Sequence, residues 1–191
     1  MKTRKTSRRK FICSASAFAF GTAAYGYASP LVAEQPQSIE EILKKQEDLV
    51  NTYFPIYGTC SQTTFLALNE TFNLKAGDTL KALASFPGIA FRGETCGAVS
   101  ACLCGIALIY EGDIPGNKLS NVPCVTFCSK FENEYGSTRC RDIIAHVTNK
   151  KYTIQKPEDY TMVARDGGLN HCKAVIHHAL KIATEIILEK A

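Results

Sequence analysis

Four cysteines lie where the sequence predicts the beginnings of helices: Cys60, Cys96, Cys140 and Cys172. In the first turn of a helix, unpaired backbone N–H groups and the positive end of the helix dipole stabilise anions. A thiol in this position is shifted toward the thiolate, the form that binds metals and attacks disulfides. Four such cysteines, gathered at one end of a helix bundle, could make a single metal or redox site.

Basic residues next to two of these cysteines should also favour the thiolate. Arg139 and Arg141 flank Cys140, and Lys173 follows Cys172. A nearby positive charge favours the ionised thiol. We therefore expect these neighbours to lower the pKa of both thiols further.

The four other cysteines that follow the N-terminal segment have a different pattern. Cys102 and Cys104 are two residues apart, so on a helix they point to opposite faces and cannot easily share a metal ion. A buried free cysteine packs like a small apolar residue, and we expect this role for both. Cys124 and Cys128 are four residues apart and share a helix face, so they could chelate an ion or complete a site.

The N-terminal segment has the layout of an export signal. A basic stretch is followed by an apolar run over residues 11–24 and by a small-residue site that ends at Ala28. The stretch "SRRKFI" (Ser7 to Ile12) resembles a twin-arginine signal, and the apolar run is shorter than the roughly 20 residues that span a bilayer. We expect a removed twin-arginine signal peptide over 1–28, a linker over 29–37, and a periplasmic or other extracytoplasmic location.

Removal of this segment changes the charge balance. Six of the 22 basic residues lie in 1–28 and none of the 18 acidic ones do, which leaves 16 basic and 18 acidic groups in the remainder. A nearly balanced charge gives no reason to expect nucleic acid as a partner. The remainder contains no second long apolar run, so we expect no stable membrane insertion after the signal is cleaved.

Helical periodicity dominates the rest of the chain. Ser38 can cap the first amphipathic segment, and Thr95 can cap a strongly apolar segment that is the most buried candidate. The segment 148–168 is the least regular and could hold a short strand or one helical turn. We predict an all-α fold, a single-domain helical bundle of five to seven helices over 38–191, with helices near 39–54, 60–72, 76–85, 96–110, 121–135, 138–147 and 170–189.

Four sequence pieces carry a resemblance to a known family: "YGTCSQTTF", "RGETCGAVSA", "YGSTRCRDI" and "NHCKAVIHHA". With their spacing, they resemble the redox-active proteins named for a C_GCAxxG_C_C cysteine pattern, over nearly all of the chain from Tyr57 to Glu189. The chain departs from the central motif at Thr95, Gly97 and Ser100.

The resemblance also bears on the cofactor. A related helical domain occurs in split-Soret cytochromes c, which carry haem and a further iron centre. The resemblance therefore implies cysteine-ligated iron. We expect no c-type haem, because the chain has no Cys-x-x-Cys-His.

Several functions fit these residues. The first is electron transfer by an iron–sulfur cluster or iron held by Cys60, Cys96, Cys140 and Cys172, with a redox partner protein. A homodimer would suit such a centre. Alternatives are a metal-free thiol–disulfide redox protein, a helical binding module stapled by disulfides, and a structural zinc site. No hydrolase or transferase motif is present, so an enzymatic role would be that of an oxidoreductase or electron carrier.

Overall fold

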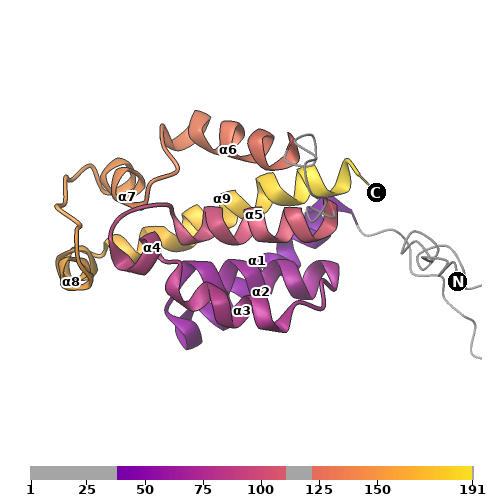
Figure 1. Cartoon of the computed structure of the whole chain (residues 1–191), viewed down its shortest axis with the longest axis horizontal. Coiled ribbons are helices and arrows are strands. Elements are labelled where there is room, and N and C mark those ends of the chain that lie inside the picture. The colour runs from indigo at the N-terminus through magenta and orange to yellow at the C-terminus, as the bar shows by residue number, and fades with distance from the viewer. Residues whose placement is uncertain (1–37, 111–121, 191) are drawn as a thin grey trace, which may run out of the picture. The chain divides into compact units, whose positions relative to one another are not determined.

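The computed structural model describes residues 38–110 and 122–190 (Figure 1). Regular structure in these two ranges is helical, without a β-strand, which confirms the predicted all-α class. No described helix combines the length and the apolar character needed to cross a membrane. The predicted signal peptide (1–28) and linker (29–37) lie outside the described residues.

Five long helices make up most of the bundle. The apolar helix α5 packs against α2 and α9, α1 packs against α2 and α9, and α6 lies against α5 and α9 (Figure 1). Segments far apart in sequence are thereby brought together, since α1 and α9 are the first and last described helices. Their bounds are α1, Ile39–Tyr57; α2, Cys60–Phe72; α5, Gly97–Tyr110; α6, Val122–Tyr135; and α9, Gly168–Leu188.

Local sequence signals explain the ends of the first helix. Ser38 accepts a hydrogen bond from the backbone N–H of Glu41, and the Glu41 carboxylate accepts one from the N–H of Ser38. This capping box satisfies two N–H groups that the helix itself cannot pair. The helix ends at Gly58, which has a φ of 62° and so takes the left-handed conformation that glycine tolerates best. The predicted Ser38 cap is confirmed.

The core is built mainly from the inner faces of α5, α6 and α9. Cys102 and Ile106 of α5 are fully buried, as are Phe127 and Phe131 of α6. The two phenylalanine rings stack four residues apart on the same helix face, with centroids 5.9 Å apart. Burying a large apolar side chain contributes roughly 1.5–3 kcal/mol, so this face of α6 fixes the helix on the bundle.

Short helices occupy the segments between the long ones and raise the helix count above the predicted five to seven. The predicted helix over 76–85 is divided into α3 and a 3₁₀ turn, and the segment 148–168 contains a 3₁₀ turn and α8. Periodicity over so few residues is too weak to fix their bounds, although the longest of them lies where a helix over 138–147 was expected. They are α3, Gly77–Ala82, with the 3₁₀ turn Leu83–Ser85; α4, Gly88–Phe91; α7, Cys140–Thr148; and the 3₁₀ turn Pro157–Asp159 leading to α8, Tyr160–Arg165.

The short element α4 has an unusual backbone. All four of its residues have positive φ values, from 45° at Ile89 to 59° at Phe91. Outside glycine, this left-handed conformation costs roughly 1–2 kcal/mol per residue. Hydrogen bonds from the Arg92 and Glu94 N–H groups to the Gly88 carbonyl, both 3.0 Å long, hold the turn closed just before Cys96.

Candidate functional site: a cavity lined by four cysteines

Four cysteines from four different helical regions line one small cavity: Cys60, Cys96, Cys140 and Cys172. The cavity has a volume of about 20 Å³, room for one water-sized sphere. The other lining residues are aliphatic: Ile143, Ile144, Val147 and Val175. These four cysteines are the set predicted from the sequence, and the structure brings them together.

Three of the four stand at a helix start. Cys60 and Cys140 are the first residues of α2 and α7, and Cys96 immediately precedes α5. The backbone carbonyl of Cys96 accepts the bond from Ser100 N–H at 3.0 Å, so Cys96 rather than Thr95 is the residue that caps α5.

The expectation of a first-turn position is wrong for Cys172. Helix α9 begins at Gly168, because Gly167 adopts the left-handed conformation and allows the chain to turn there. Cys172 is therefore the fifth residue of its helix, beyond the unpaired N–H groups of the first turn.

A backbone bridge holds Cys96 and Cys140 side by side. Thr95 and Arg139 pair as an isolated antiparallel bridge. On either side of it, Cys96 N–H donates to the Thr138 carbonyl at 2.9 Å and Cys140 N–H donates to the Glu94 carbonyl at 2.6 Å. The starts of α5 and α7 are thus tied together at the cavity.

Glu94 organises the charges beside this bridge. Its carboxylate pairs with Arg139 at 3.1 Å and also with Arg141. The hydrogen bond from Arg139 and the two positive charges lower the pKa of Glu94. Arg141 also donates from Nε to the Gly93 carbonyl at 3.1 Å. The two arginines therefore serve mainly as partners of Glu94 and of the loop before α5.

Cys96 is the cysteine whose environment favours a thiolate. Its pKa is lowered, first by a hydrogen bond from the Cys60 thiol and then by the backbone N–H groups of Ala98 and Val99. These donors outweigh the cost of burial. The predicted effect of a helix start on thiol acidity is confirmed at this residue.

For the other three cysteines the predicted lowering of the pKa is wrong. Cys60 has a raised pKa, first because its thiol donates to Cys96 and then because it is buried. Burial is the main cause of the raised pKa of Cys140, and it raises the pKa of Cys172 to about 12. An enclosed apolar site disfavours a charged thiolate, and the positive charge of Arg141 does not compensate at Cys140.

Tyr160 is a site residue that was not predicted from the sequence. Its hydroxyl lies 3.1 Å from the sulfur of Cys140, within hydrogen-bonding distance for sulfur. It lies in the irregular segment 148–168, where no periodicity indicates which side chains turn inward. No sequence signal could have found it.

The remaining cysteines of the described ranges are free thiols away from the cavity. Cys102 is fully buried in the core, as predicted. Cys104 is half-buried beside a second, smaller cluster that contains Phe65. Cys124 and Cys128 are half-buried on α6, and the nearest hydrogen-bond acceptor of Cys124 is the Leu103 carbonyl at 3.9 Å.

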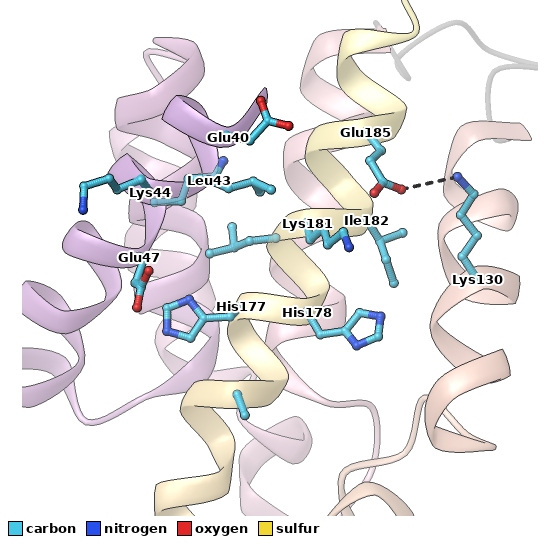
Figure 2. A pocket seen from close by; sticks show the side chains of 13 residues that line it. Glu40, Leu43, Lys44, Glu47, Lys130, His177, His178, Lys181, Ile182 and Glu185 are labelled. Carbon is cyan, nitrogen blue, oxygen red and sulfur yellow. Dashed lines mark ion pairs between the residues drawn. The ribbon is translucent and has the colours of Figure 1, made fainter. Parts of the chain in front are cut away.

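A much larger groove, of about 1040 Å³, lies elsewhere on the bundle between α1, α6 and α9. Figure 2 shows His177 directed toward Glu47 on α1 and His178 directed toward α6, with the ion pair between Lys130 and Glu185 beside them. Burial lowers the pKa of His177. The groove contains mixed charges and no cysteine, so it is separate from the candidate redox site.

The described part of the chain contains no ready-made site for a single metal ion. In residues 38–110 and 122–190, no three His, Cys, Asp or Glu side chains stand close enough to hold one ion together. The four cavity cysteines therefore supply thiolate donor atoms, but their sulfurs would have to be drawn closer together to bind one ion among them.

Fold and site together define an all-α protein with a small, aliphatic, four-cysteine cavity. The chain belongs to the family described as "Putative redox-active protein (C_GCAxxG_C_C)", which matches residues 58–186. No curated protein and no solved structure is similar enough to match it. The family match spans all four cavity cysteines, and it assigns the chain to a redox-active class.

Proposed function

We propose that this protein is an exported electron-transfer protein whose four cavity cysteines hold an iron–sulfur cluster or another thiolate-ligated metal centre. The observation that carries the proposal is the convergence of Cys60, Cys96, Cys140 and Cys172 on one cavity with otherwise aliphatic walls. Thiolates are the ligands that iron–sulfur clusters select, and four of them complete the usual ligand set.

The surroundings of the four sulfurs support this use. Aliphatic side chains of α7 and α9 complete the lining of the cavity, and an apolar surrounding with limited solvent access is one of the factors that set the potential of such a centre. When bound, a cluster would supply one-electron chemistry to a group of side chains that otherwise has none. The protein's own part is to gather the four sulfurs and keep water away. A structural zinc ion would use the same sulfurs without electron transfer.

A second candidate function follows from one specific contact. The Cys60 sulfur lies against the backbone of Gly97, the residue after Cys96, and each of the two thiols is the first cause of the shift in the other's pKa. Such a pair could form a disulfide by passing two electrons and two protons to the disulfide of a partner protein, whose two sulfurs leave as thiols. In that case the cavity would work without a metal.

Metal and sulfide analysis separates these functions. The protein would be purified without oxygen after cytoplasmic expression, and its iron, zinc and acid-labile sulfide would be measured with an ultraviolet–visible spectrum. Iron with sulfide, lost in Cys96→Ser and Cys140→Ser, is the result expected for a cluster. The matched control is Cys128→Ser, which changes a half-buried cysteine outside the cavity and should retain the iron.

Other outcomes would contradict the cluster. Zinc without sulfide would indicate a structural ion. Protein without metal, in which Cys60 and Cys96 are recovered as a disulfide after mild oxidation, would favour the dithiol function.

A further inference from the structure

Tyr160 makes a polar contact with the otherwise aliphatic and sulfur-lined site. It is the first residue of α8, and its hydroxyl lies 3.1 Å from the sulfur of Cys140. Within the part of the chain that the structure describes, it is the one side chain other than a cysteine that hydrogen-bonds to a sulfur of the cavity.

The left-handed turn α4 fixes Tyr160 in this position. Gly88 lies so close to the Tyr160 hydroxyl that a Cβ at residue 88 would stand 2.4 Å from the oxygen. Phe91 contacts the tyrosine ring edge-on, with ring centroids 5.4 Å apart and an interplanar angle of 88°. The turn therefore leaves room for the hydroxyl at one end and packs against the ring at the other.

Hydrogen bonds to the cysteine sulfurs are one of the means by which a protein sets the potential of a thiolate-ligated centre. A donor stabilises the state in which the sulfur carries more negative charge, which is the reduced state of the centre. Cys140 itself is only 7% exposed, so water gives its sulfur little of the same stabilisation.

We propose that Tyr160 is a positioning residue that donates a hydrogen bond to the sulfur of Cys140 and thereby raises the redox potential of the four-cysteine centre. This inference rests on the proposed function, because it concerns the properties of the centre held there. The left-handed turn at Gly88 and Phe91 is the element that keeps the donor in place.

The test compares two tyrosine variants. Tyr160→Phe removes the hydroxyl and keeps the ring that packs against Phe91. Tyr152→Phe is the matched control, because the hydroxyl of Tyr152 donates to Asp166 at 2.9 Å and no hydrogen bond links it to a cysteine. We expect Tyr160→Phe to have a more negative midpoint potential than wild type and the control, with unchanged iron and sulfide. An unchanged potential would overturn the inference.

A second measurement keeps the inference testable if the protein proves to hold no metal. That result would defeat the proposed function and leave the hydrogen bond from Tyr160 to Cys140 as the part of the inference under test. In the reduced, metal-free protein, loss of the donor should slow the alkylation of Cys140 roughly threefold at a fixed pH, because its thiolate is less stabilised. The rate at Cys172 should stay the same. Equal rates at Cys140 in Tyr160→Phe and Tyr152→Phe would show that the hydroxyl does not act on this sulfur.

Discussion

The sulfur of Cys60 lies against the backbone of Gly97, so closely that a Cβ on Gly97 would stand 2.6 Å from it. The same Cβ would also meet the backbone nitrogen of Ser61 at 2.9 Å. The first turns of α2 and α5 therefore approach each other at a point where only glycine fits. This contact explains why the residue after Cys96 has no side chain.

We expect Gly97→Ala to damage the cavity. The methyl group must displace either the Cys60 sulfur or the backbone of α2, and overpacking of this kind costs roughly 1–3 kcal/mol. Iron content and the free energy of unfolding in urea would both fall. Gly105→Ala on the same helix is the control, because its Cβ would meet the flexible end of Leu68 at 2.8 Å and Gly105 does not line the four-cysteine cavity. Full iron content in Gly97→Ala would contradict this account of the contact.

The interaction between the Cys60 and Cys96 thiols predicts that Cys96 ionises at a lower pH than an ordinary cysteine in the reduced, metal-free protein. The pKa of Cys96 lies below its ordinary value of 9.0. The thiolate transition seen at the lowest pH by ultraviolet absorbance should therefore belong to Cys96 and be absent from Cys96→Ser. In Cys60→Ser this transition should shift to higher pH, because Cys96 loses the interaction that lowers its pKa most. If the same transition persists in Cys96→Ser, it belongs to another cysteine. Cys104→Ser is the control and should leave the transition unchanged.

Burial of Cys172 predicts a loss of stability in alkaline solution. Its pKa rises from an ordinary value of 9.0 to about 12 in the folded protein. A raised pKa gives stability that is complete below the unfolded value and is lost as the pH rises toward the folded one. The contribution of this thiol to the free energy of unfolding should fall by on the order of 2 kcal/mol between about pH 9 and pH 11.

Urea unfolding of the reduced, metal-free protein at several pH values measures this effect. Cys172→Ser should show a weaker loss of stability over the same range than wild type does. The comparison removes the contributions of lysines and tyrosines, which titrate in both proteins. Identical pH profiles would mean that the Cys172 thiol is more accessible to water than the structure shows.

Much of the fold was predictable, because long helices carry long-range periodicity. The segment that begins at Ser38 shows both its cap and its apolar face in the sequence, and the first turn of α1 forms as predicted. The four cysteines could be selected as a set from their places near helix starts and from the family resemblance. Their convergence on one cavity agrees with that selection.

The details of the site were not predictable for identifiable reasons. The start of α9 depends on the left-handed conformation of Gly167. The presence of a glycine in the sequence does not reveal whether that residue takes the left-handed conformation. The raised pKa of Cys140 comes from burial by residues distant in sequence. Tyr160 reaches the site through a short helix whose six residues are too few to show a period.

Arg141 ties the start of α7 to the loop before α5, next to the cavity. Its guanidinium bonds to Glu94 and to the Gly93 carbonyl at once, an arrangement that the single ammonium group of lysine cannot reproduce. We expect Arg141→Lys to loosen the bridge between α5 and α7 and to speed the alkylation of Cys96 and Cys140 in the metal-free protein. The exposed Arg165 provides the control, Arg165→Lys, which should leave both rates unchanged. Equal rates in the two variants would exclude this role.

A buried polar pair joins the first and last helices. Gln46 and Thr184 are both buried, and each donates a hydrogen bond to the other, at 3.0 and 3.1 Å. Thr184→Val leaves the Gln46 amide without a partner, which should lower the free energy of unfolding by about 1–3 kcal/mol. The double variant Gln46→Leu with Thr184→Val should recover part of this loss. A single variant as stable as wild type would contradict the pairing.

The four cavity cysteines are far apart along the chain, and this determines when during folding the cavity is complete. Cys60 lies in the second described helix and Cys172 in the last, yet both line the same cavity. A chain that is still being synthesised, or whose final helix has not docked, presents three separate thiols and no enclosed site. Any centre that requires all four sulfurs needs Cys172 of the last helix in place, so its presence would mark a molecule in which α9 has docked.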